Sequence, residues 1–123
     1  MEKKKETGAF VGQLYSFNVG LKLYHWHVSG PGSYAQHMAL DEALEGLAET
    51  LDSVAETSYA LLGDIEIVVP ETKVPKDIVK YASDFYKYIE SKRSIFTESF
   101  SEAFCDDLQE NIQQLLYRLK RLQ

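Results

Sequence analysis

The sequence predicts a single all-α domain in which four helices form a bundle and one long connection divides the chain near its middle. Three observations predict this fold. Apolar residues recur with the period of about 3.6 residues that is typical of amphipathic helices. Glycine and proline residues interrupt this pattern at two places. Finally, residues 1–123, with a hydrophobic fraction of 45%, are sufficient for one globular core but not for two.

The first helix is expected over residues 5–28. Its apolar positions follow the helical period and are Phe10, Leu14, Phe17, Leu21, Tyr24 and Val28. Gly30 suits the left-handed backbone position that follows many helix ends, and Pro31 cannot continue a helix. We therefore expect a tight turn at residues 29–32.

The second helix is expected over residues 34–62. Ser33, followed three residues later by Gln36, matches the capping-box pattern of a helix start. Gly63 provides a stop. The apolar stripe between them consists of Leu40, Leu44, Leu47, Leu51, Val54 and Leu62. The short turn before Ser33 makes the first two helices an antiparallel hairpin.

The segment 63–75 is expected to be an extended crossover, because it is rich in β-branched residues and contains proline. Helices of about 24 residues are ~36 Å long, and this segment reaches at most ~43 to 47 Å. It can therefore just cross the bundle from end to end. Two hairpins joined by one long crossover form the ferritin-like arrangement of a four-helix bundle, in contrast to a simple up-down-up-down bundle.

The third and fourth helices are expected over residues 76–97 and 100–122, where the helical pattern resumes. A single unbroken helix of that length would measure roughly 70 Å, which exceeds the size of such a domain. A break near Thr97 to Ser101 is therefore required. Ser99 and Glu102 have the spacing of a cap for the fourth helix.

The composition limits the function. A net charge of −6 repels nucleic acid and attracts cations, and there is no lysine-rich tail, so DNA binding is not expected. The single cysteine, Cys105, excludes an intrachain disulfide and is expected to be a buried thiol in a helix. Neither a signal peptide nor a membrane span of ~20 apolar residues is recognisable, so a cytoplasmic location is expected.

Five residues carry the candidate chemistry: His25, His37, Asp41, Asp52 and Glu56. Imidazole and carboxylate ligands together suit divalent iron, zinc or manganese, whereas an all-oxygen set would suit magnesium or calcium. His37 and Asp41 are one helical turn apart, and the tight turn returns His25 to the same place. These three residues are expected to hold a metal ion.

Asp52 and Glu56 form a second pair one turn apart, but Asp52 lies about 16 Å along the helix from Asp41. No single metal ion bridges that gap. Either the two groups are unrelated, or a second copy of the helix crosses antiparallel and brings its Asp52 and Glu56 to the first group. A two-fold dimer would then hold two identical sites. A di-iron centre within one chain is excluded because no histidine follows His37.

This motif resembles that of the Dps miniferritins, the DNA-protection-during-starvation proteins. Their pattern is a His-Trp dipeptide, a His, an Asp and an Asp-x-x-x-Glu, and it falls here on the following residues in the same order and spacing: His25, Trp26, His37, Asp41, Asp52 and Glu56. The resemblance implies an intersubunit iron site, oxidation of Fe(II) by peroxide or dioxygen, and often a twelve-subunit shell that stores ferric mineral. A homo-oligomer, at least a two-fold dimer, is thus expected.

Two other functions stay open from the sequence. The chain could be a non-enzymatic helical bundle that assembles or binds a partner and keeps a residual metal site. It could also bind zinc or manganese without redox turnover. Near the ligands, His27 is interpreted as a surface or supporting residue, and Trp26 as a packing residue.

Overall fold

In the computed structural model of the chain, which describes residues 2–122, the protein is all-helical. The helices are α1 Glu2–His27, α2 Ser33–Leu62, α3 Ile78–Lys92 and α4 Ser99–Arg121, with a short 3-10 helix η1 at Arg93–Ile95. No β-strand occurs in residues 2–122. The predicted all-α class with four helices is therefore confirmed. Residues 1 and 123 of the predicted domain lie outside the described residues.

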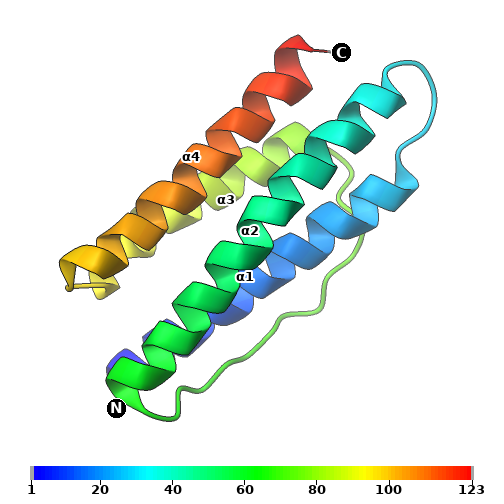
Figure 1. Cartoon of the computed structure of the whole chain (residues 1–123). Coiled ribbons are helices and arrows are strands. Elements are labelled where there is room, and N and C mark those ends of the chain that lie inside the picture. Colours follow the sequence, from blue (N-terminus) through cyan, green and yellow to red (C-terminus); the bar gives the residue numbers. More distant parts are fainter. Residues whose placement is uncertain (1, 123) are drawn as a thin grey trace.

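The four α-helices pack in a ring, in which α1 contacts α2, α2 contacts α4, α4 contacts α3 and α3 contacts α1. Figure 1 shows that α1 and α2 form one antiparallel hairpin and α3 and α4 another. The connection 63–77 runs along the length of the molecule, so α2 and α3 point in the same direction. It is two residues longer than the predicted crossover 63–75. No helix within residues 2–122 has the length and apolarity needed to cross a membrane.

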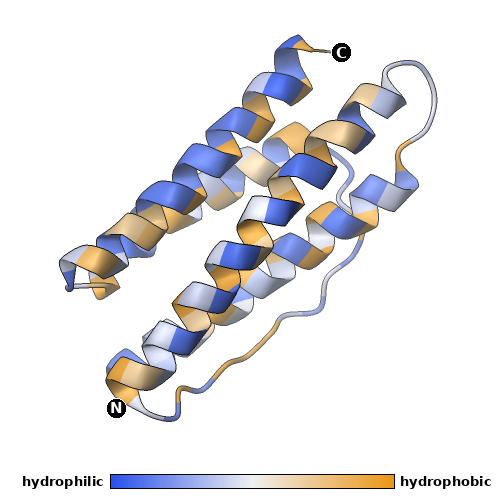
Figure 2. Cartoon of the chain, in the orientation of Figure 1, coloured by the Kyte–Doolittle hydropathy of each residue, from blue (hydrophilic) through white to orange (hydrophobic). Residues whose placement is uncertain are grey.

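The core lies between the helices and contains the apolar stripes that the sequence predicted. Its most buried large side chains include Phe10, Leu14, Phe17, Leu21, Leu40, Leu47, Ile89, Leu108, Ile112, Leu115 and Leu119. Figure 2 shows hydrophilic residues on the outward face of α4 and hydrophobic residues on its inner side. Removal of these side chains from water is the main favourable contribution to folding.

The crossover packs against a stripe of small residues on α1. Methyl groups on Gly8 and Gly12 would overlap the backbone carbonyls of Glu66 and Val68. Four helical residues rise ~6 Å, and two extended residues span ~6.6 Å, so successive crossover carbonyls match successive helix turns. Glycine is required at both positions because the two backbones touch.

The stripe continues at Ser16 and Gly20. The Ser16 and Thr72 hydroxyl oxygens lie 2.6 Å apart in a hydrogen bond. Gly20 leaves space for the phenol of Tyr81, whose hydroxyl donates to the Ser16 carbonyl at 3.4 Å. The crossover and the start of α3 are thus both held against α1.

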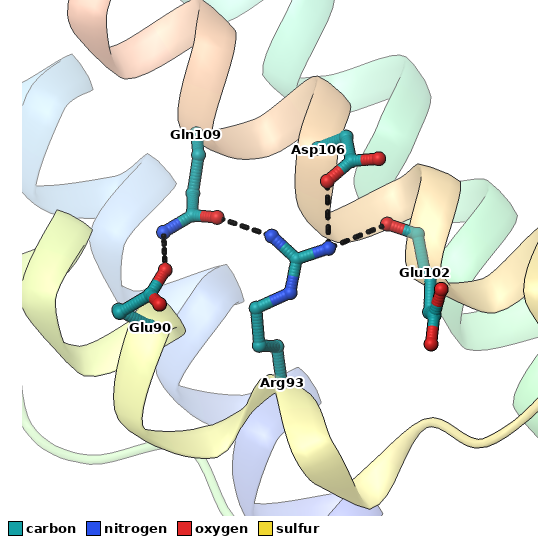
Figure 3. A network of polar contacts seen from close by, with 5 residues as sticks. All are labelled: Glu90, Arg93, Glu102, Asp106 and Gln109. Carbon is teal, nitrogen blue, oxygen red and sulfur yellow. Dashed lines mark hydrogen bonds and ion pairs between the residues drawn. The ribbon is translucent and has the colours of Figure 1, made fainter.

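The third helix ends earlier than predicted. It stops at Lys92 and continues as η1, whereas the sequence predicted a helix to residue 97 with a break at 97–101. Figure 3 shows the reason: the guanidinium of Arg93 reaches across to α4. It donates to Gln109 Oε1 at 2.6 Å, to the Glu102 carbonyl at 3.2 Å and to Asp106 Oδ1 at 2.6 Å. These contacts fix the chain reversal into α4.

Two predicted caps are wrong. Gly32, with a φ of 80°, is the N-cap of α2, and no side chain caps that end; the Ser33 amide instead donates to the Gly30 carbonyl at 3.0 Å. The N-cap of α4 is Glu98, also without a side-chain bond. A cap that the sequence pattern did not predict occurs at Asp77, whose carboxylate accepts the Lys80 amide at 3.0 Å and so starts α3 later than residue 76.

We expect the substitution Gly12→Ala to lower the free energy of unfolding by about 1–3 kcal/mol, because the added methyl overlaps a backbone carbonyl that cannot rotate away. Urea denaturation followed by circular dichroism measures this. The matched control is Gly46→Ala in α2, where the methyl meets only the flexible amide of Asn111. Equal stability of the two variants would contradict the close contact between crossover and helix.

Candidate metal centre

Three of the five candidate residues meet where α1 passes into α2. His25 lies in the last turn of α1, and His37 and Asp41 lie on the first turns of α2. The turn between the helices is tight because Gly30 and Gly32 adopt positive φ angles of 89° and 80°. One potential ligand atom from each of the three residues lies within 4.8 Å of the others.

The Asp41 carboxylate faces the Nε2 atoms of both imidazoles. His25 Nε2 is 2.7 Å from Asp41 Oδ1, and His37 Nε2 is 4.0 Å from Asp41 Oδ2. The two rings are stacked, with centroids 3.8 Å apart and planes inclined by 23°. The ligand atoms therefore converge on one small region.

The backbone of α1 orients His37. Its Nδ1 lies 3.0 Å from the His25 carbonyl oxygen, at the free C-terminal end of the helix. In the tautomer that makes this bond, Nδ1–H donates and Nε2 keeps its lone pair for a metal ion. Hydrogen bonds of this kind are typical of histidine ligands.

The side chain of His25 is only 7% exposed. Its Nε2 contacts Asp41 Oδ1 at 2.7 Å, whereas its Nδ1 has no hydrogen-bond partner in residues 2–122. Buried polar atoms without partners are rare in folded proteins. A cation bound beside this pair could take both the imidazole nitrogen and the carboxylate oxygen as ligands, so the residues present fit a divalent metal ion.

Burial lowers the pKa of His25 from its usual value; the Asp41 charge acts in the opposite direction, and the neighbouring His37 and Lys22 lower the pKa further. The ring is therefore neutral at pH 7. Because only the neutral imidazole binds a metal ion, His25 keeps this ability to lower pH than an exposed histidine does.

Asp52 and Glu56 do not join this cluster within one chain. Both are exposed on α2, one turn apart, and Asp52 follows Asp41 by about 16 Å along the helix. The structure thus places the candidate residues in two groups on one helix hairpin. In residues 2–122 the only group of three or more such side chains that could hold a metal ion is His25, His37 and Asp41.

The residues beside the cluster differ in part from the predictions. His27 is exposed, as expected of a surface residue. Trp26 is 67% exposed, so its interpretation as a packing residue is wrong within one chain; Lys22 Nζ lies 5.6 Å from its ring centroid. No sequence pattern pointed to Arg118, which comes from α4 and forms an ion pair with Glu42 at 3.0 Å.

A hollow of about 570 Å³ lies between α2 and α4 and reaches Asp41. Met38 and Leu122 form part of its apolar wall, and Glu45 and Arg118 part of its charged wall. The carboxylate of Asp41, whose side chain is 48% exposed, is thus accessible from solvent on this side.

Residues 25–119 match a protein family described as a family of unknown function, DUF5856. The chain belongs to this family. The DUF5856 match begins at His25 and so contains all five candidate residues. No curated protein and no solved structure matches the chain. The resemblance of this DUF5856 member to Dps proteins rests on its motif alone.

The thiol of Cys105 does not belong to the candidate metal centre. It is fully buried in α4, and burial raises its pKa to about 11. The prediction of a buried thiol is confirmed.

We expect the thiol of Cys105 in the folded chain to react at pH 8 at least roughly a hundredfold more slowly with a disulfide reagent than in denaturant. A shift of two pKa units alone lowers the thiolate fraction by that factor. Release of the coloured thiol from the reagent measures both rates. Fast reaction of the folded chain would contradict the position of Cys105 in the core.

We expect His25→Ala to weaken zinc or manganese binding by at least roughly tenfold, since loss of a ligand exceeds the effect of losing its supporting bonds. Isothermal titration calorimetry of the purified chain measures the affinity for the metal ion. His27→Ala is the matched control, because that exposed imidazole lies two residues away and outside the cluster. Similar losses in both variants would show that the metal ion binds elsewhere.

Proposed function

We propose that the chain is a ferritin-like, Dps-like ferroxidase, whose iron site is completed by a second copy of the chain. The observation that carries this proposal is the convergence of His25, His37 and Asp41, one of whose imidazoles is buried against the carboxylate. The up-down-down-up course of the helices, with its crossover along α1, also supports a ferritin-like bundle.

The register of α2 supports a two-fold site. The midpoint between His37 and Glu56 and the midpoint between Asp41 and Asp52 are the same point of the helix, between Gly46 and Leu47. A two-fold axis through this point would set Asp52 of a second copy opposite Asp41, and its Glu56 opposite His37. Both pairs would meet in a single antiparallel crossing of two α2 helices.

The outer face of α2 is free for such a crossing. At 100° per residue, Asp41, Asp52 and Glu56 fall within a sector of roughly 60°. Apolar residues lie in the same part of the helix surface and are unusually exposed: Tyr34 at 75%, Met38 at 45% and Tyr59 at 44%. Exposed apolar groups around a polar strip are typical of contact surfaces between proteins.

The charges of this surface make association dependent on a cation. A crossing of this kind would bring Asp41 close to Asp52 and Glu56 of the second copy, and like charges repel at short distance. A divalent metal ion removes this repulsion and adds ligand bonds. We therefore expect the dimer to be stronger in the presence of metal.

In the proposed reaction Fe(II) is the substrate. Two Fe(II) ions each give one electron to hydrogen peroxide, which takes up two protons and yields two water molecules and two Fe(III) ions. The imidazoles of His25 and His37 supply nitrogen ligands, and the carboxylates compensate the charge, which favours the ferric product. The twelve-subunit shell and mineral storage stay predictions.

A second function is favoured by the fact that one chain alone supplies three ligands. Two imidazoles and one carboxylate, with positions left for water, also suit zinc or manganese without redox turnover. Metal analysis of the purified protein and an iron oxidation assay distinguish the two functions.

We expect His37→Ala and Glu56→Ala each to lower the rate of peroxide-dependent Fe(II) oxidation by about tenfold or more, because each removes a ligand. Absorbance of the ferric product over time measures the rate. Glu71→Ala is the matched control, as it removes an exposed carboxylate of the crossover, outside the outer face of α2. If both ligand variants oxidise Fe(II) at the wild-type rate, the ferroxidase proposal is wrong.

A further inference from the structure

A small pocket lies among α1, α2, α4 and the residue that follows η1. Four hydroxyl-bearing residues line it, namely Thr7 on α1, Thr57 and Ser58 on α2, and Ser101 on α4, and Phe96 contributes to its apolar wall. Thr7, Ser58 and Ser101 are each less than 5% exposed. The pocket is thus narrow, and hydroxyl groups from three helices meet in it.

The hydroxyl of Thr7 has no partner. This residue is 1% exposed, and its Oγ1 makes no hydrogen bond with any residue in 2–122. A buried hydroxyl without a hydrogen bond destabilises the folded state, and most such groups in proteins bind a protein atom or an ordered water. We therefore expect the cavity beside Thr7 to bind a molecule that can form a hydrogen bond with this hydroxyl.

The size of the cavity and the charge of its wall limit which molecule can bind there. The cavity volume of about 10 Å³ is close to the minimum for the centre of one water molecule. The charged residues of its wall, Lys3 and Glu98, are linked to each other at the rim: Lys3 Nζ donates to Thr97 Oγ1 at 3.2 Å, which donates to Glu98 Oε2 at 3.0 Å. The interior is left with hydroxyl and hydrocarbon groups, which suit a neutral molecule.

We propose that this cavity is a binding site for a single structural water molecule, held by Thr7 Oγ1 together with the hydroxyl groups of Ser58 and Ser101. A buried water usually makes two to four hydrogen bonds, and these three hydroxyls supply that number. The water links α1, α2 and α4 at the end of the bundle that lies opposite the metal centre. It therefore stabilises the chain independently of metal binding.

The substitution Thr7→Val tests the role of the hydroxyl. Valine has the shape and branching of threonine, so packing and helix propensity change little. If a water is bound, the variant loses one of its hydrogen bonds and unfolds at a lower urea concentration than wild type. If the cavity is dry, removal of an unpaired hydroxyl raises the urea midpoint, and this result overturns the proposal.

Thr50→Val is the matched control, because the Thr50 hydroxyl donates to the Gly46 carbonyl within α2 at 3.2 Å and lies outside the cavity. We expect a smaller change in its urea midpoint than in that of Thr7→Val. A high-resolution crystal structure of the wild-type chain tests occupancy directly. Density for a water within about 3 Å of Thr7 Oγ1 is expected, and an empty cavity there would overturn the proposal.

Discussion

The contact between the backbone of the crossover and the small-residue stripe of α1 is the constraint on which the rest of the structure depends. Only glycine at positions 8 and 12 allows the carbonyls of Glu66 and Val68 to lie directly on the helix. The crossover thus follows α1 along its length and delivers the chain to the start of α3 at the other end of the bundle. Because the crossover takes this path, the outer face of α2 remains open, and this face carries Asp41, Asp52 and Glu56.

The candidate metal centre is less well satisfied than the rest of the core. His25 is buried there, with Nε2 against the Asp41 carboxylate and Nδ1 without a hydrogen-bond partner in residues 2–122. In a protein without a ligand this arrangement is unfavourable, since a buried polar group loses its hydration. Departures of this kind from ordinary packing rules occur mainly at functional sites. The tight glycine turn keeps the three side chains together despite this loss of stability.

Much of the fold could be predicted from the sequence, because the information is local. The helical period identified buried positions such as Leu40, Leu47 and Val54, and Gly30 marked the turn. The length of the crossover segment, compared with that of the helices, predicted that it can just cross the bundle from end to end. The approach of His25 to Asp41 followed from the same short turn, so the spacing along the chain was enough to place three of the five site residues together.

Other features could not be predicted because they depend on distant residues. The end of α3 at Lys92 is determined by Arg93, whose partners lie on α4. The role of Gly12 depends on where the crossover lies, and the exposure of Trp26 depends on which surfaces the bundle leaves uncovered. Whether two copies of the chain associate is even harder to predict from the sequence. The pattern of ligands shows how two α2 helices would be aligned if they crossed, but not that they do cross.

The most direct test is a subunit-mixing experiment with two variants of low activity. If the site is shared, a dimer of one His37→Ala chain and one Glu56→Ala chain contains one site with both defects and one intact site. Refolding equal amounts of the two variants together should therefore restore about a quarter of the wild-type iron oxidation rate, since half of randomly paired dimers are mixed. Activity no greater than that of the separately refolded variants would contradict a site built from two chains.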